Sequence, residues 1–283
     1  MGYPRARKKR KGKGGSLLAW VRIMGIINVT PDSFSDGGRY CTHASAVAQA
    51  DALVAAGADL LDVGGESTRP FAVPVSAEEE LRRVIPAIIS IRKKYSLPIS
   101  IDTSKATVAH QALGAGADMI NDVSALRHDP AMIELVRATE VPVVIMHMQG
   151  TPGDMQVQPH YQDVVAEITA FFRERLSWLQ ALGVDCRRII LDPGIGFGKT
   201  LAHNLTILKN LSALASIGQP ILLGHSRKRF LGDLTGKQVA EERDIATAVV
   251  SALAVAQGVS IVRVHDVASS RQAIQIATAI GAA

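Results

Sequence analysis

Short apolar stretches alternate with longer, Ala-rich amphipathic stretches from Leu18 to the C-terminus. The apolar stretches have the length of buried strands and run into polar or glycine-rich residues, while the amphipathic stretches have the period of helices. The pattern occurs eight times. It predicts strands near residues 22–27, 59–63, 98–102, 118–121, 142–146, 188–191, 220–224 and 260–264. It predicts helices near residues 43–56, 77–94, 104–115, 129–139, 160–182, 203–215, 239–257 and 267–280.

Eight alternating strands and helices predict an α/β fold, a single (β/α)8 TIM barrel. Strands that alternate with helices form a parallel sheet, and continuously apolar strands are buried on both faces. No Gly/Ser/Pro-rich linker divides the chain, so one barrel domain is expected over residues 18–283. A barrel of this kind needs roughly 250 residues and carries its chemistry on the loops that follow the strands.

Two long loops follow the first two predicted strands. Residues 28–38 bring an amide, carboxylates, hydroxyls and an aromatic ring together, and residues 64–70 are rich in Gly, Ser and Thr. Pro-Asp-Ser and Asp-Gly-Gly are also strong turn formers, so an ordinary turn is the alternative for the first loop. Both loops are expected to act as mobile covers over a substrate.

Acceptor side chains end three of the predicted strands, namely Asp102, Asn121 and Asp192. In a closed barrel they converge on the mouth, where a buried carboxylate is costly unless it is paired or hydrogen-bonded. They therefore predict a ligand rich in N–H donors, such as the edge of a guanidine-like heterocycle. Helix capping is the alternative for Asp102, because Thr103 and Ser104 follow it directly.

Cationic side chains follow the last two strands, namely Lys228, Arg263 and His265. Loops at this place, together with a helix N-terminus near Val267, commonly bind phosphate groups in these barrels. An anion such as pyrophosphate is the expected occupant. Surface salt bridging by the run Arg227 to Arg229 is the alternative.

Several familiar motifs are incomplete. Residues 193–200 nearly match GxxxxGK[ST], but Pro193 replaces the first glycine, and the glycines are spaced GxGxG rather than GxGxxG. The eight histidines form no HxH or HExxH, which argues against a zinc hydrolase. Five of them are expected to be solvated on or near helices: His43, His110, His128, His160 and His203.

Charge is concentrated at the N-terminus. Residues 1–15 hold seven cations and no acid, so the remaining 24 basic and 26 acidic residues leave the body near −2, against +5 for the whole chain. Residues 1–17 are expected to be a disordered basic tail, and neither nucleic acid nor a membrane is an expected partner. Cys41 and Cys186 form no CxxC pair. With no signal-peptide pattern, a reducing cytoplasmic location is expected.

Eight segments together resemble the dihydropteroate synthase family of the folate pathway. They are NVTPDSFSDGG (28–38), DVGGESTRP (62–70), SIDTSK (100–105), NDVS (121–124), MHMQG (146–150), LDPGIGFGK (191–199), SRK (226–228) and RVHDV (263–267). The resemblance implies condensation of 6-hydroxymethyl-7,8-dihydropterin pyrophosphate with p-aminobenzoate, giving 7,8-dihydropteroate and pyrophosphate. It also implies Mg2+ as cofactor and a homodimer formed through helices on the outer wall.

The resemblance implies these roles at the matching positions. The pterin would contact Asp102, Asn121, Met146, Asp192, Phe197 and Lys228. The pyrophosphate would contact Asn28, Arg263 and His265, with Asn28 also a magnesium ligand. The p-aminobenzoate would contact Phe34, Thr68, Arg69, Pro70 and Ser226. Catalysis would fall to Asp102, Lys228, Arg263 and Asp36, with Asp36 supporting a cationic pterin methylene in a dissociative substitution.

Two alternatives stay open from the sequence. A methyltetrahydrofolate-type pterin methyltransferase would share the pterin carboxylates but would not need the pyrophosphate cations or the Ser-Thr-Arg-Pro loop. A non-catalytic pterin-binding paralogue would keep the loops without turnover.

Overall fold

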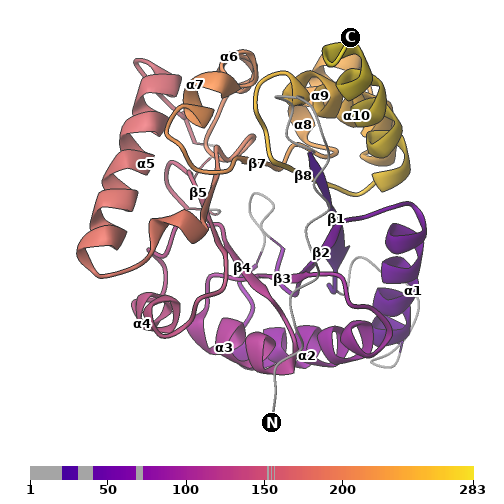
Figure 1. Ribbon diagram of the computed structural model, residues 1–283, viewed down its shortest axis with the longest axis vertical. Coiled ribbons are helices and arrows are strands. Elements are labelled where there is room, and N and C mark those ends of the chain that lie inside the picture. The colour runs from indigo at the N-terminus through magenta and orange to yellow at the C-terminus, as the bar shows by residue number, and fades with distance from the viewer. Residues whose placement is uncertain (1–20, 31–40, 68–72, 152, 154, 156) are drawn as a thin grey trace.

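The described residues form one eight-stranded parallel barrel surrounded by helices (Figure 1). The computed structural model describes residues 21–30, 41–67, 73–151, 153, 155 and 157–283. Sheet order is β6-β5-β4-β3-β2-β1-β8-β7, and a parallel bridge between Leu191 and Ile221 joins the two ends of that order. The TIM barrel predicted from the sequence is therefore confirmed. The predicted tail at residues 1–17 lies outside the described residues.

The strands match the predicted positions closely. They are β1 (Arg22–Asn28), β2 (Leu60–Gly64), β3 (Ile99–Asp102), β4 (Met119–Asp122), β5 (Val143–Met146), β6 (Ile189–Asp192), β7 (Leu222–Leu223) and β8 (Ile261–Val264). Seven of them contribute one side chain each to a single apolar cluster: Met24, Leu60, Met119, Val144, Ile190, Leu222 and Ile261. This cluster fills the barrel interior, while a larger apolar core packs the outer face of the strands against the helices.

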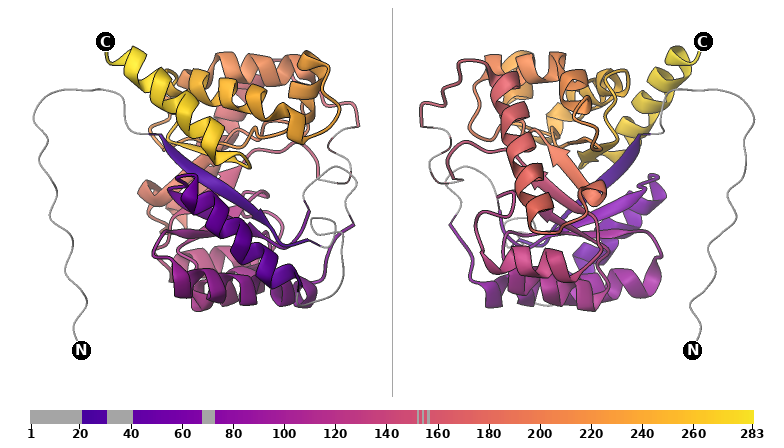
Figure 2. Two further views of the ribbon diagram at one scale, coloured as in Figure 1. Left: turned by 90° about the vertical axis from the view of Figure 1, so that its right-hand side faces the viewer. Right: turned by 60° about the vertical axis from the view of Figure 1, so that its left-hand side comes forward.

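The helices form the outer ring in Figure 1. They are α1 (Cys41–Ala55), α2 (Ala77–Lys94), α3 (Ala106–Ala115), α4 (Ala131–Ala138), α5 (Val164–Ala181), α6 (Leu201–Lys209), α7 (Leu211–Ala215), α8 (Arg229–Thr235), α9 (Asp244–Val255) and α10 (Val267–Gly281). Two 3-10 turns, η2 (Cys186–Arg188) and η3 (Glu241–Arg243), precede β6 and α9. Figure 2 shows the end of α10 projecting beyond the rest of the barrel.

Local sequence signals account for the helix boundaries. Ser76 caps α2 by accepting a hydrogen bond from the Glu79 backbone N–H at 3.2 Å. Three acidic residues occupy the first turn of α2 and three basic residues its last turn, as the helix dipole favours.

Two parts of the helix prediction are wrong. The helix expected at 203–215 is two helices, because the Asn210 backbone leaves helical geometry, with φ of −121° and ψ of 27°, and its N–H donates to the Ile207 carbonyl at 3.0 Å. The short helix α8, which follows β7, was not expected at all. Its first residues, Arg229 and Phe230, belong to a segment too short to show a helical period.

We expect the substitution Met24→Ala to lower the free energy of unfolding by about 2–5 kcal/mol, because it leaves a cavity inside the barrel. The control Leu234→Ala, at a side chain that is 53% exposed on α8, is expected to change it by no more than about 0.5 kcal/mol. Urea denaturation measures both. Equal losses for the two variants would contradict the assignment of Met24 to the interior.

Candidate active site

A polar layer lies directly above the apolar barrel interior. Side chains alternate along a strand, so the residue two positions after each interior residue points into the barrel again. On β2, β4, β5, β6 and β8 these next positions are Asp62, Asn121, Met146, Asp192 and Arg263. On β3, Asp102 lies two residues beyond the buried Ser100. The carboxyl ends of the strands therefore form a charged mouth on an apolar floor.

Arg263 binds two carboxylates in this layer. Its Nε donates to Asp62 Oδ2 at 2.6 Å and its terminal nitrogen donates to Asp102 Oδ2 at 2.7 Å. The Asn121 side-chain amide also donates to Asp62 Oδ2, at 3.1 Å. Strands β2, β3, β4 and β8 are thus joined by one polar network at the mouth.

Burial dominates the protonation of this network. It raises the pKa of Asp102 to about 7, a shift that Arg263 opposes and the Asp62 carboxylate reinforces. Burial also acts to lower the pKa of the Arg263 guanidinium, but the two carboxylates outweigh it and leave that pKa above its ordinary value. Asp102 is therefore poised to exchange a proton near neutral pH.

Asp102 does not cap the following helix. The N-cap of α3 is Lys105, and the Ala106 backbone N–H donates instead to the Asp129 carboxylate at 2.8 Å. The capping alternative for Asp102 is therefore excluded, and its carboxylate remains directed at Arg263.

Asp192 and Lys228 face one another across the β6 and β7 ends of the mouth. Asp192 accepts a hydrogen bond from the Gly194 backbone N–H at 2.8 Å, and burial raises its pKa although Lys228 opposes the shift. Burial lowers the pKa of Lys228 to about 8, with Asp192 opposing it. The Lys228 Nζ donates to the Ile195 carbonyl and lies 4.4 Å from the centre of the Phe197 ring.

The surface-salt-bridge alternative holds for the neighbours of Lys228 but not for Lys228 itself. Arg227 adopts a left-handed backbone with φ of 57° and pairs with Asp244 at 2.7 Å. Arg229 is 91% exposed beside Asp233. Lys228 instead packs against the loop after β6, so it is the residue of the run Arg227 to Arg229 that belongs to the mouth.

Ser226 and His265 join the loops after β7 and β8. Ser226 Oγ and His265 Nδ1 are 2.9 Å apart, and the His265 backbone N–H donates to the same hydroxyl at 3.1 Å. Asp266 accepts from the Ser269 backbone N–H at 3.1 Å, so this donor of the α10 N-terminus, expected to be open to an anion, is already capped.

The aromatic and thioether side chains lie at the β5 and β6 ends of the mouth, beside Lys228. Met146 belongs to an apolar cluster with Met148 and Met155, against which Phe197 packs.

Asn28 is the last residue of β1; it is half-buried and pairs in register with Gly64 of β2. The remaining predicted site residues lie outside the described residues: Phe34, Asp36, Thr68, Arg69 and Pro70.

The chain is similar to proteins of known identity. Residues 24–265 match the family described as pterin binding enzyme. A dihydropteroate synthase of Neisseria meningitidis serogroup C is 46% identical over 263 residues, covering 92% of this chain and 93% of that protein. The structure of Xanthomonas albilineans dihydropteroate synthase with 4-aminobenzoic acid gives a TM-score of 0.88 at 49% identity, covering 94% of this chain and 95% of that one. A structure from the same organism with 7,8-dihydropteroate gives 0.86 at 46%, covering 95% and 96%.

The chain belongs to the dihydropteroate synthase family. It is therefore a transferase of folate biosynthesis, and the resemblance found in its loops is confirmed over nearly the whole chain. None of the helices in the described part of the chain is long and apolar enough to cross a membrane.

Sequence reasoning gave no role to three buried polar residues that the structure places at or beside the mouth. Asp62 is 0% exposed and binds Arg263. Lys199 is buried with its Nζ 3.1 Å from His147 Nδ1, between the loops after β5 and β6. Burial lowers the pKa of Lys199 to about 7 and that of His147 to about 3. For Asp62 the signal was present, since it lies two residues beyond the interior residue Leu60.

Close backbone approach fixes the loops after β5 and β6 against each other. Gly194 has φ of 66°, and a Cβ there would lie 2.0 Å from the His147 carbonyl oxygen. Only glycine fits both constraints. The loop that carries Phe197 is therefore held close to Met146 by backbone contact.

We expect stability to reveal the raised pKa of Asp102. Between its ordinary value of 3.8 and about 7 the folded protein holds a proton that the unfolded chain has released. Stability contributed by this group is therefore present at low pH and is lost as pH rises through that window. Relative to the non-ionising variant Asp102→Asn, wild-type stability should fall from about pH 4 to about pH 7 and then level off. Urea denaturation at intervals of pH measures the difference, and a constant difference would contradict the raised pKa.

Proposed function

We propose that the charged mouth condenses 6-hydroxymethyl-7,8-dihydropterin pyrophosphate with p-aminobenzoate. The observation that carries the proposal is the division of the mouth into an acceptor side and a cationic side. Acceptors lie at the carboxyl ends of β3, β4 and β6, while cations follow β7 and lie on β8. A dihydropterin pyrophosphate has the complementary division, with N–H donors on its ring and negative charge at the other end.

The acceptor side would hold the pterin. Asp102, Asn121 and Asp192 offer oxygen atoms to the amino group and ring N–H donors. Lys228, whose charge interacts with that of Asp192, would meet the same ring. Met146 and Phe197 would pack against the ring. Because Lys228 already stacks on Phe197, pterin recognition and ring packing involve the same corner of the mouth.

The cationic side would hold the pyrophosphate. Arg263 and His265 come from β8 and its loop, and Asn28 ends the adjacent strand β1. These groups stabilise negative charge as it develops on the leaving group, an electrostatic effect that is large in water-excluded sites. Ser226, bonded to His265, would lie between this side and the p-aminobenzoate.

Mg2+ is part of this proposal, with Asn28 as its protein ligand. The described residues contain no cluster of three or more His, Cys, Asp or Glu able to hold a metal ion. Mg2+ bound to phosphates needs few protein ligands, and the half-buried Asn28 offers an uncharged amide oxygen at the mouth. The donor set therefore fits a pyrophosphate-bound ion, which would supply further charge neutralisation.

The substitution would proceed dissociatively. The bond between the pterin methylene carbon and the pyrophosphate oxygen breaks with its electron pair on the oxygen. The electron-rich dihydropterin stabilises the cationic methylene, with Asp36 proposed to support it. The aniline nitrogen of p-aminobenzoate then forms the new C–N bond and loses a proton. An aniline is nucleophilic at neutral pH, so no strong base is required. Phe34, Thr68, Arg69 and Pro70 are proposed to hold p-aminobenzoate.

The reaction is tested by pyrophosphate release in the presence of Mg2+, with and without p-aminobenzoate. We expect release to depend on p-aminobenzoate and to yield dihydropteroate. Asp102→Asn and Lys228→Ala should each lower kcat/KM by on the order of 100-fold or more while remaining folded, because each removes a charge that acts on the reacting pterin. Pterin binding without release would favour the non-catalytic paralogue. Wild-type rates in either variant would remove that residue from the catalytic set.

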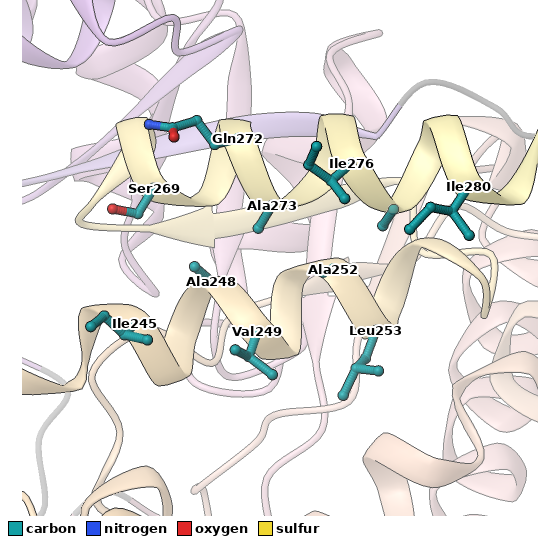
Figure 3. Close-up of a pocket in the computed structure, with 11 residues that line it drawn as sticks. Ile245, Ala248, Val249, Ala252, Leu253, Ser269, Gln272, Ala273, Ile276 and Ile280 are labelled. Atoms are coloured by element: carbon teal, nitrogen blue, oxygen red, sulfur yellow. The ribbon is translucent and has the colours of Figure 1, made fainter.

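A homodimer is the proposed assembly, formed through the outer faces of α9 and α10. Figure 3 shows the two helices side by side, with aliphatic side chains along both. They border a groove of about 530 Å³ whose eleven lining residues include no charged side chain. Ile245, Leu253, Ile276 and Ile280 are each at least 63% exposed. Extended exposed apolar surfaces mark interfaces, and a two-fold axis would place this surface against its own copy.

The cytoplasmic location expected from the sequence stays a prediction.

We expect the double variant Val249→Glu/Leu253→Glu to be monomeric in sedimentation velocity, because it places two carboxylates in the apolar groove. Leu205→Glu, on the half-exposed face of α6, is the matched control and should stay dimeric. A monomeric wild-type protein, or a double variant that remains dimeric, would contradict this interface.

A further inference from the structure

We propose that Asp62 is a positioning residue that fixes Arg263 and Asn121 together, so that one buried carboxylate aligns the pyrophosphate and pterin sides of the mouth. The inference rests on the proposed function for the roles of those two residues. It adds a residue that contacts neither substrate in the proposal and acts through its two partners.

Asp62 Oδ2 is the shared acceptor. Arg263 Nε donates to it at 2.6 Å and Asn121 Nδ2 donates to it at 3.1 Å. The three residues come from β2, β8 and β4, which are separated in the barrel by other strands. A single oxygen atom therefore sets the distance between a group for the pyrophosphate and a group for the pterin.

The orientation of Asn121 follows from this contact. A carboxylate only accepts hydrogen bonds, so the Asn121 NH2 group must face Asp62. Its carbonyl oxygen is then left to face other groups and can accept from the N–H donors of a pterin. Without Asp62, the Asn121 amide would be free to rotate and direct its NH2 group at the N–H donors of the pterin.

Arg263 is held by Asp62 and shared with Asp102. The Asp102 side chain is 11% exposed and is itself proposed to bind pterin, whereas the Asp62 side chain is 0% exposed. A pterin that engages Asp102 competes for the same carboxylate as Arg263. Asp62 lies below the reach of the ligand, so its contact with Arg263 is the one that persists when substrate is bound.

Asp122 shows what a buried carboxylate looks like when it serves the local fold. Its two oxygens accept from the Ser124 and Leu126 backbone N–H groups, at 2.7 and 3.1 Å, and so shape the loop after β4. The Asp62 carboxylate instead accepts its two hydrogen bonds from side chains of the mouth, those of Arg263 and Asn121. The second oxygen of Asp62, Oδ1, has no hydrogen-bond partner among the described residues. An unpaired buried acceptor costs free energy, so local stability alone does not account for a carboxylate at this position.

The test compares Asp62→Asn with Ser100→Ala in the full-length protein. Ser100 pairs in register with Asp62 on β3 and has a buried hydroxyl without a partner among the described residues, so it controls for disturbance of the barrel. Calorimetry measures binding of 6-hydroxymethyl-7,8-dihydropterin, and separately of inorganic pyrophosphate with Mg2+. Steady-state kinetics give kcat and the KM for p-aminobenzoate.

We expect Asp62→Asn to weaken the binding of both ligands roughly 10- to 100-fold, by analogy with the loss of residues that orient metal ligands. The KM for p-aminobenzoate and the affinities of Ser100→Ala should stay near wild type. Arg263→Ala should weaken pyrophosphate alone and Asn121→Ala the pterin alone. Adding Asp62→Asn to Arg263→Ala should weaken pyrophosphate little further, since coupled residues are not additive.

Normal binding of both ligands by folded Asp62→Asn would overturn the inference, as would equal losses in Ser100→Ala. Should Asp62→Asn fail to fold, Asp62→Glu keeps the charge but displaces the carboxylate by one methylene, and the same loss for both ligands is expected. Wild-type affinities in Asp62→Glu would then overturn the inference. A wild-type protein that binds neither ligand would overturn the proposed function itself, and this inference with it.

Discussion

Alternation of side chains along eight parallel strands decides where the chemistry of this protein lies. Each strand turns every second residue into the barrel, so the apolar layer around Met24 and Leu60 dictates that Asp62 and Arg263 also point inward, one step nearer the mouth. The apolar layer excludes water from below. Charges two residues later are therefore buried by geometry, and each needs a partner across the barrel.

Because each buried charge needs a partner, the charged side chains of the site stabilise one another. Burial opposes the charge on Asp102, Asp192 and Lys228, and the nearest opposite charge opposes the effect of burial in each case. A ligand that brings N–H donors to one side and negative charge to the other replaces these internal partners with its own. The free site is thus already polarised in the sense that the proposed substrate requires, which is the electrostatic preorganisation that favours catalysis.

The sequence predicted the barrel and most strand positions because the strands are continuous apolar runs that end in polar residues. It failed for short local elements and for a residue whose role depends on a distant strand. The break at Asn210 and helix α8 depend on local turns too short to show a period. Asp102, Asn121, Asp192 and Lys228 were found because each follows or ends a strand. Asp62 was not predicted because it lies inside a predicted strand. Its role depends on Arg263, which is 201 positions away in the sequence.

The two carboxylates that bind Arg263 allow the mouth to separate leaving-group stabilisation from pterin binding. Leaving-group departure needs a cation fixed in place, whereas pterin binding needs carboxylates that are free to accept new donors. One carboxylate cannot serve both needs when it is the sole partner of the cation. Two carboxylates at different depths can, because the fully buried Asp62 retains the guanidinium while the more exposed Asp102 exchanges partners. The position of each residue along its strand sets its depth in the barrel, since Asp62 pairs in register with Ser100 and lies two residues below the level of Asp102. This difference in depth lets two neighbouring carboxylates have different roles.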